Sequence, residues 1–243
     1  MKKIFILSLV VFFAQVDVCF AWGPMTHTYF AHEVLRAASL LSASIYSLLT
    51  AYSTNFIYGS IVADNYLGKP GHKNPHDWDT GFQLLTFAQK RTDAAFAYGF
   101  LSHLAADTVA HGQMDLGAKT KLGHAWIEME SDSLMARSCW KSVVSLDKKR
   151  TRSNDKLAGS VIDPVDCRSK SFQQVYKMSI KMSVLNSRRW TRFYKEDFAG
   201  YHRMSVVRAI DVVNKKENSC YVREDPNIKK GKRLSAKLQN ILA

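Results

Sequence analysis

Glycine and proline are scarce in this chain of 243 residues, which contains only 12 Gly and 5 Pro. An all-β sandwich or barrel needs many tight turns, and such turns depend on these two residue types. No internal repeat and no low-complexity block is present either. Hydrophobic residues make up 47% of the chain, which is ample for a packed core. The composition therefore predicts a single helical domain, with or without a tail.

Acidic residues are also in deficit, since 21 Asp and Glu face 34 Lys and Arg and give a formal net charge of +13. Such an excess favours binding to anionic surfaces, either phospholipid headgroups or nucleic acid. It does not choose between them. No feature of the sequence indicates an obligate protein partner.

The apolar run at the N-terminus, Ile4 to Val16, is too short to cross a bilayer comfortably. Lys2 and Lys3 precede this run, and Ala21 offers a small residue before a cut. We therefore predict that residues 1–21 form a signal peptide and that the protein is exported to the periplasm or the cell exterior. An uncleaved anchor and a lipid-modified Cys19 are the weaker interpretations. Loss of this segment lowers the net charge by one, to +12.

Cysteine is rare as well, with four residues in the chain and three after the predicted cut. These three are Cys139, Cys167 and Cys220. In an oxidising compartment one pair could form a disulfide and leave one thiol free. The sequence does not say which pair this is.

Apolar residues recur at helical spacing along most of the remaining chain, which predicts several helices in one domain over residues 22–217. The expected helices cover residues 25–53, 80–90, 92–112, about 122–144, 171–191 and 196–216. Lys, Arg, Ser, Asn and Pro dominate residues 147–170, so we expect an exposed basic loop there. Residues 218–243 are basic and poor in large apolar side chains, and we expect them to form a loose tail.

Three residues that can bind metal recur every fourth position in the expected 92–112 helix. They are His103, Asp107 and His111, and each step of four rotates the side chain by only about 40° around the helix. On a largely apolar helix these side chains would be costly to bury without partners. A bound metal supplies the partner, and a hydrogen-bonded His-Asp-His cluster does so equally well.

The next expected helix repeats the spacing with His124 and Glu128, which favours the metal. Imidazole and carboxylate are common zinc ligands where no thiolate is offered. Five ligands on two helices are enough for more than one ion. Two-metal sites are typical of phosphate-ester hydrolysis, in which they clamp phosphate oxygens and lower the pKa of an attacking water.

Four further residues are candidates for the same site. His76 follows a loop and can complete the coordination of one ion, with His72 as a competitor. Asp64 ends an apolar segment, and its alternative role is a helix cap. Trp22 would offer a free α-amino group after cleavage, five residues before His27, and an amine with its own carbonyl can chelate a metal.

Five segments in order resemble the zinc-dependent phospholipase C family, the catalytic domain of glycosylphosphatidylinositol-specific phospholipase D and, more distantly, the single-strand nucleases. These segments are Trp22-Gly-Pro-Met-Thr-His27, Tyr58-Gly-Ser-Ile-Val-Ala-Asp64, His76-Asp-Trp-Asp, Gly99-Phe-Leu-Ser-His103-Leu-Ala-Ala-Asp107-Thr-Val-Ala-His111 and His124-Ala-Trp-Ile-Glu128. They run from Trp22 to about Asp132. The gap from Asp107 to His111 is similar to that of the phospholipase D branch, whereas the gap from Trp22 to His27 is similar to that of the nucleases.

The resemblance implies an all-α domain with three zinc ions in a cleft between helices. Carried over residue by residue, the three ligand sets are His76, His103 and Asp107; His111, His124 and Glu128; and Trp22, His27 and a bridging Asp107. Asp64 would lie near the first ion as a ligand or as the general base.

We therefore expect an exported zinc-dependent phosphodiesterase that hydrolyses phospholipids at an anionic membrane surface, by phospholipase C or D chemistry. One alternative is a single-strand nuclease on the same zinc site, in which Tyr58, Tyr66 and Trp78 are candidates to stack bases. Another is a non-catalytic protein that binds zinc or an anionic surface.

Overall fold

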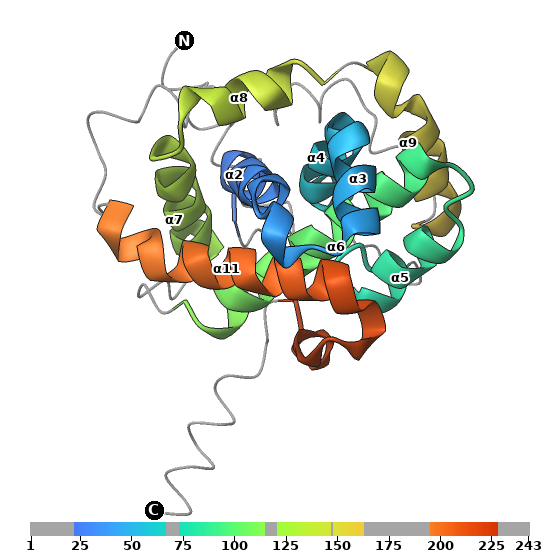
Figure 1. The fold of residues 1–243 in the computed structure, drawn as a ribbon. Helices are drawn as coiled ribbons and strands as arrows, with labels where there is room; N and C mark the ends of the chain where they lie inside the picture. Colours follow the sequence, from blue (N-terminus) through green and yellow to red (C-terminus); the bar gives the residue numbers. More distant parts are fainter. Residues whose placement is uncertain (1–21, 67–72, 115–120, 147, 163–194, 228–243) are drawn as a thin grey trace, which may run out of the picture.

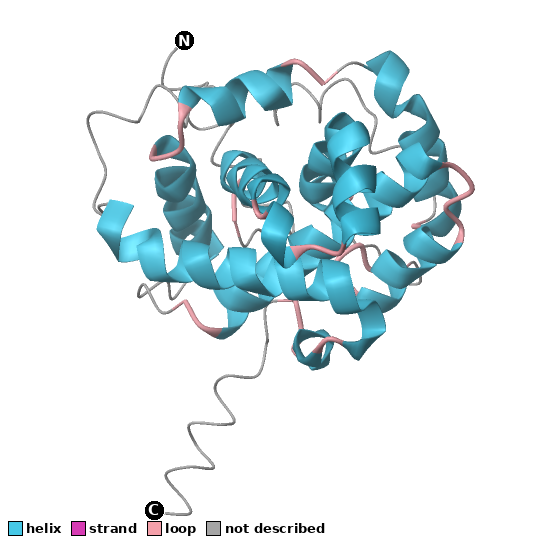
Figure 2. Cartoon of the chain, in the orientation of Figure 1, coloured by secondary structure: helices cyan, strands magenta, loops and turns pink. Residues whose placement is uncertain are grey.

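A computed structural model describes residues 22–66, 73–114, 121–146, 148–162 and 195–227. Every regular element in these ranges is a helix, which confirms the all-α class (Figure 2). The longer helices are α2 (Pro24–Arg36), α3 (Ala43–Ala51), α4 (Ser53–Val62), α5 (Trp78–Thr86), α6 (Arg91–Gly112), α7 (Lys121–Ser133), α8 (Arg137–Val144), α9 (Lys148–Val161) and α11 (Lys195–Lys215). The short 3-10 turns are η1 (Ala38–Leu40), η2 (Ala63–Asn65), η3 (Lys216–Asn218) and η4 (Cys220–Arg223).

The helices form an inner group and a surrounding frame (Figure 1). Helices α2 and α4 lie in the middle of the molecule, and α6 packs closely against α4. Helices α5, α7, α8, α9 and α11 surround this inner group in Figure 1. Within the described residues, none of the helices combines the length and the apolar character that crossing a bilayer would demand.

The two innermost helices, α4 and α6, approach each other backbone to backbone at a pair of glycines. A Cβ atom on Gly59 would lie 2.0 Å from the carbonyl oxygen of Phe96, and one on Gly99 would lie 2.0 Å from that of Phe56. Neither distance is tolerable for a side chain, because a carbonyl inside a helix cannot move away. Two glycines therefore set how closely the end of α4 approaches the middle of α6.

Helix α6 fills the centre of the domain because nearly all of its faces are apolar. Phe96, Phe100, Leu101 and Leu104 are fully buried on it. The sequence predicted this helix over residues 92–112, and it spans Arg91–Gly112. The expected helix over residues 196–216 is also present as α11, and the one over residues 80–90 as α5, which begins two residues earlier and ends at Thr86.

The single helix expected over residues 25–53 is wrong, because the chain turns twice there. Ala37 ends α2 outside the helical region, and Leu41 and Ser42 are extended before α3 begins at Ala43. A second break at Tyr52 separates α3 from α4. Apolar spacing continues through these turns, so periodicity alone did not reveal them.

The expected helix over residues 122–144 is likewise interrupted, since α7 ends at Ser133 and α8 begins at Arg137. The expected basic loop over residues 147–170 is wrong where the structure describes it, because Lys148–Val161 form α9. The basic residues concealed a buried stripe. This stripe consists of Thr151, Asn154, Leu157, Ala158 and Val161.

The C-terminal region beyond α11 is packed as far as the structure describes it. Residues 216–227 contain two 3-10 turns, and Tyr221 and Val222 pack against the core cluster of α2, α3 and α6. This part of the expected loose tail is therefore ordered. The expected helix over residues 171–191 lies outside the described residues.

Candidate metal centre

Two of the predicted ligands lie one turn apart in the buried middle of α6. His103 and Asp107 are each 0% exposed. The imidazole Nε2 of His103 lies 3.1 Å from a carboxylate oxygen of Asp107. The spacing of four residues therefore places both groups on one helix face, as the sequence predicted.

Three other segments bring side chains to this face. Asp64 comes from η2 at the end of α4, and His27 comes from the first turns of α2. His76 comes from the loop before α5. All three are buried, with exposed fractions of 3%, 1% and 5% respectively. Five of the predicted site residues therefore converge from parts of the chain up to 80 residues apart.

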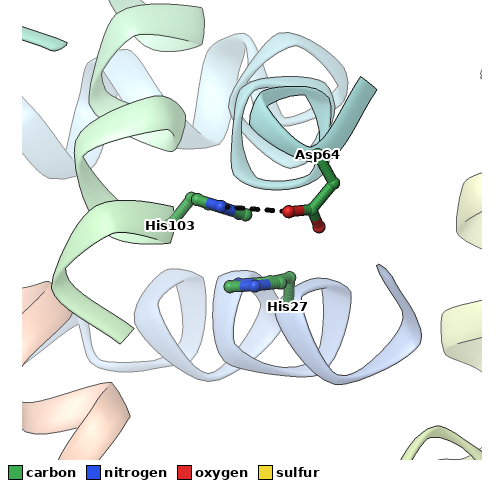
Figure 3. Close-up of side chains that lie close together, drawn as sticks. All are labelled: His27, Asp64 and His103. Carbon is green, nitrogen blue, oxygen red and sulfur yellow. Dashed lines mark ion pairs between the residues drawn. The ribbon is translucent and has the colours of Figure 1, made fainter. Parts of the chain in front are cut away.

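The distances within this cluster are short. His27 Nε2 lies 3.3 Å from Asp107 Oδ1, and His76 Nε2 lies 3.2 Å from Asp64 Oδ1. Asp64 Oδ1 is also 3.6 Å from His103 Nε2, and the rings of His27 and His103 stack with their centres 4.0 Å apart. Figure 3 shows His27, Asp64 and His103 turned toward one another from three separate helical segments.

The cluster contains two sets of three donors that could each hold one ion. His27, Asp64 and His103 form one set, and His76, His103 and Asp107 form the other. In each set the ligand atoms lie within 4.8 Å of one another. The second set is the one that the resemblance implied for one zinc ion.

A hydrogen bond behind His103 fixes which of its nitrogens faces the cluster. Its Nδ1 lies 3.0 Å from the backbone carbonyl oxygen of Ser60, so Nδ1 carries the proton and donates it. Nε2 then faces Asp64 and Asp107 and is the nitrogen that remains available to a metal. Metal-binding histidines are typically held in this way by a second hydrogen bond, which sets the tautomer and the ring orientation.

Several polar atoms of the cluster have no hydrogen-bond partner in the described part of the chain, which favours a metal site over a purely hydrogen-bonded core. No hydrogen bond within the described residues reaches His27 Nε2, His103 Nε2, either carboxylate oxygen of Asp107 or Asp64 Oδ2. Leaving such groups buried without partners is costly. Nitrogen and carboxylate oxygen are the donors that zinc takes, so the residues present fit this metal.

The electrostatics of the cluster are those of a site that attracts a cation. Burial alone would lower the pKa of His103, but the charges of Asp107 and Asp64 outweigh it and raise this pKa to about 9. Burial opposes ionisation of Asp107 as well, yet the charge of His103 holds the pKa of that carboxyl well below its usual range. Burial, followed by the charge of His103, lowers the pKa of His27. The buried charges of Asp64 and Asp107 therefore favour a positive charge among these side chains.

The second predicted ligand set, His111, His124 and Glu128, is only partly described. His111 lies in the last turn of α6, and Glu128 is buried on α7. The side chain of His124 lies outside the described residues. Burial raises the pKa of Glu128 well above its usual value, and the neighbouring charges of Asp64, Asp132 and Asp107 add to this effect. Glu128 therefore faces the same acidic region, while this ligand set stays a prediction.

Trp22 is held firmly beside the cluster by its side chain. It is 0% exposed, its indole N–H donates to the carbonyl oxygen of Ala106, and its ring packs edge-on against Phe30 and His202. The sequence suggested an α-amino ligand or a buried aromatic anchor. The structure demonstrates the anchor, and the chelate stays a prediction.

Asp132 supports the site from behind, which the sequence did not reveal. Its buried carboxylate accepts hydrogen bonds from the backbone N–H groups of Met25 and Thr26 and from the Thr26 hydroxyl. It thereby caps the N-terminus of α2, which carries His27. A Cβ on Gly23 would lie 2.4 Å from this carboxylate. Position 132 is one turn beyond Glu128, which is the signal that could have identified it.

Comparison with known proteins agrees with this site. A family model described as zinc-dependent phospholipase C matches residues 26–203, which is more than half of the chain. Searches of the curated proteins and of the solved structures find no significant match.

Proposed function

Because this chain belongs to the zinc-dependent phospholipase C family and is therefore a hydrolase, we propose that it hydrolyses the phosphodiester of a phospholipid at its metal cluster. The observation that carries the proposal is the convergence of five buried side chains, four of which have at least one polar atom that no described residue hydrogen-bonds. Zinc dependence follows from the family. The cleavage of phospholipids by C-type or D-type chemistry, the number of ions and the cellular location are part of the proposal.

His76, His103 and Asp107 would hold one ion, and His27 with Asp107 would hold another. Zinc at these positions supplies a Lewis acid that polarises the phosphoryl oxygens and lowers the pKa of water. His111, His124 and Glu128 would hold the third proposed ion. The Trp22 amine and carbonyl would join His27 once residues 1–21 have been removed.

Asp64 has the geometry of a general base. One of its oxygens, Oδ1, lies 3.2 Å from His76 Nε2, while no described residue hydrogen-bonds the other, Oδ2. Oδ1 is thereby fixed, and Oδ2 is left to orient an attacking water and to accept its proton. Such proton transfer typically contributes about 10²–10⁴-fold to the rate.

A single-strand nuclease on the same site receives little support from Tyr58 and Trp78, two of its three candidate aromatic side chains. The Tyr58 hydroxyl donates to Asp155, and its ring packs against Phe96. The Trp78 indole N–H donates to the carbonyl oxygen of Glu224, and its ring stacks on Phe82. Both residues are engaged inside the protein rather than presented to a nucleic-acid base.

One assay tests the substrate directly. Protein that begins at Trp22 and has been loaded with zinc is incubated with phosphatidylcholine vesicles, with anionic phospholipid vesicles and with single-stranded DNA. We expect phosphodiester hydrolysis in the vesicles and loss of this activity after chelation. Cleavage of DNA with intact lipid would contradict the proposal and favour the nuclease.

Export by the N-terminal segment belongs to the same proposal. The support is the sequence pattern of residues 1–21 together with the buried position of Trp22 directly after it. N-terminal sequencing of the protein recovered from a secreting host should find Trp22 as the first residue. Recovery of the uncleaved chain from the cytoplasm would contradict it.

A further inference from the structure

The loop that carries His76 is closed by two asparagine side chains, one of them from the far end of the chain. The His76 backbone N–H donates to the Asn74 side-chain oxygen, and the His76 carbonyl accepts from the Asn227 side-chain nitrogen. The two asparagines also bond to each other, at 2.8 Å. Both backbone groups of a predicted metal ligand are therefore held in one ring of three residues.

The same C-terminal segment also contacts the first residue of α5, directly after this loop, and reaches α6 through Arg208 of α11. The carbonyl oxygen of Glu224 accepts from the Trp78 indole, and its carboxylate accepts from Arg208. The same guanidinium nitrogen of Arg208 donates to the hydroxyl of Thr108, which directly follows Asp107. The segment thus bridges the two elements whose ligands, His76 and Asp107, must meet.

The segment itself is fixed to α11. The Ser219 hydroxyl donates to Asp211, and the Arg208 guanidinium lies 4.8 Å from the centre of the Tyr221 ring. Asp225 accepts from the backbone N–H and from the side-chain amide of Asn227. Residues 219–227 lie beyond the part of the chain that the family model matches.

We propose that residues 219–227 form a clasp that positions His76 for metal binding, with Asn227 as its principal positioning residue. The inference rests on the proposed zinc site. Side chains that hold a metal ligand from behind commonly change metal affinity about 10–100-fold when they are removed. His76 lies in a loop outside the helices, so the clasp supplies the order that a helix supplies to His103.

Asn214 offers a matched control, because it makes the same kind of bridge at a place remote from the cluster. Its side-chain oxygen accepts from the Ser42 backbone N–H, and its side-chain nitrogen donates to the Leu40 carbonyl. Asn227→Ala and Asn214→Ala therefore each remove one asparagine that joins distant segments. Only the first removes a contact to a ligand-bearing loop.

The experiment measures zinc affinity by competition with a chromogenic chelator in the full mature chain. We expect Asn227→Ala to lower the affinity for one zinc ion about 10–100-fold, whereas Asn214→Ala should retain the wild-type affinity. Asn74→Ala removes the other asparagine of the same hydrogen-bonded ring and should lower the affinity for the same zinc ion. The double variant Asn74→Ala/Asn227→Ala should lose less zinc-binding free energy than the two single variants lose together, because both residues belong to one ring.

Wild-type affinity in both Asn227→Ala and Asn74→Ala would overturn the clasp, and so would equal losses in the Asn227→Ala and Asn214→Ala proteins. Phospholipid hydrolysis is measured separately on the same samples. Zinc affinity that depends on Asn227 in a protein that leaves phospholipids intact would overturn the proposed function and support the clasp.

Discussion

The inner helices and the frame are held together by different kinds of contact. Helices α4 and α6 cross at Gly59 and Gly99, where their backbones touch and apolar side chains surround them. The frame also packs on this pair through apolar side chains, such as Leu157 on α9 and Val213 on α11. Single polar side chains that span long stretches of sequence add to this packing. Asn154 on α9 bonds to Asn55 and Asp93, and Arg208 on α11 bonds to Thr108.

This difference separates the two tasks of the fold. The inner crossing brings Asp64 to His103 and therefore decides whether a metal cluster exists. The polar bridges hold the other segments that carry cluster residues. Asp132 holds α2, and Asn227 holds the His76 loop. We therefore expect changes in the crossing to affect folding, and changes in the bridges to affect the site with a smaller cost in stability.

The largest expected effect is on turnover, in Asp64→Asn. The amide retains the shape of the side chain but cannot accept a proton, so kcat should fall about 10²–10⁴-fold. Thermal unfolding should stay close to that of the wild type, because Asp64 lies at the end of α4 rather than in the crossing. Most of the zinc should be retained, because His76, His103 and Asp107 form a set without Asp64. A variant with normal turnover would return Asp64 to the role of a turn residue.

The crossing itself is tested by adding a single methyl group. Gly59→Ala should lower the free energy of unfolding by about 2–3 kcal/mol, because the new Cβ meets the carbonyl oxygen of Phe96. Gly200→Ala on α11 is the matched control, since nothing lies within 4 Å of its Cβ. In that control the free energy of unfolding should rise by about 0.5–1 kcal/mol, because alanine has a higher helix propensity than glycine. Denaturant unfolding that ranks the two variants the other way would refute a close crossing.

A polar bridge should show a smaller effect on stability. Asp132→Ala removes three hydrogen bonds at the N-terminus of α2, and loss of such a cap costs about 1–2 kcal/mol. Asp79→Ala removes an exposed acidic residue from the first turn of α5 and should change stability by less than about 0.5 kcal/mol. Equal unfolding midpoints for these two variants would show that Asp132 does not hold α2.

The smallest expected effect concerns the outer surface. The net positive charge should draw the protein to anionic vesicles, and salt screens exposed charges beyond about 10 Å at 0.1 M ionic strength. Hydrolysis of anionic vesicles should therefore fall several-fold as salt is raised, while hydrolysis of a short soluble substrate changes little. The same salt dependence for both substrates would locate the effect inside the site.

Much of the inner group could be predicted from the sequence. Local rules sufficed for α6, because a helix without proline and with ligands four residues apart leaves few alternatives for where those ligands point. The same rules failed at residues 37–42 and 134–136, where apolar spacing runs on through a turn. They also failed for α9, whose basic composition concealed the buried Asn154 and Leu157.

The sequence by itself determined the helical class and the shared face of His103 and Asp107, because both depend on residues within a turn or two of each other. The family match adds hydrolysis and zinc to these. The family resemblance implied that His27, Asp64 and His76 join that face, but no local rule places them there, and the tertiary structure brings them together. Only the tertiary structure decided that Asp132 and Asn227 hold the segments behind them. Those contacts join residues 12 to 151 positions apart, and such distances are fixed by how whole helices pack rather than by local periodicity.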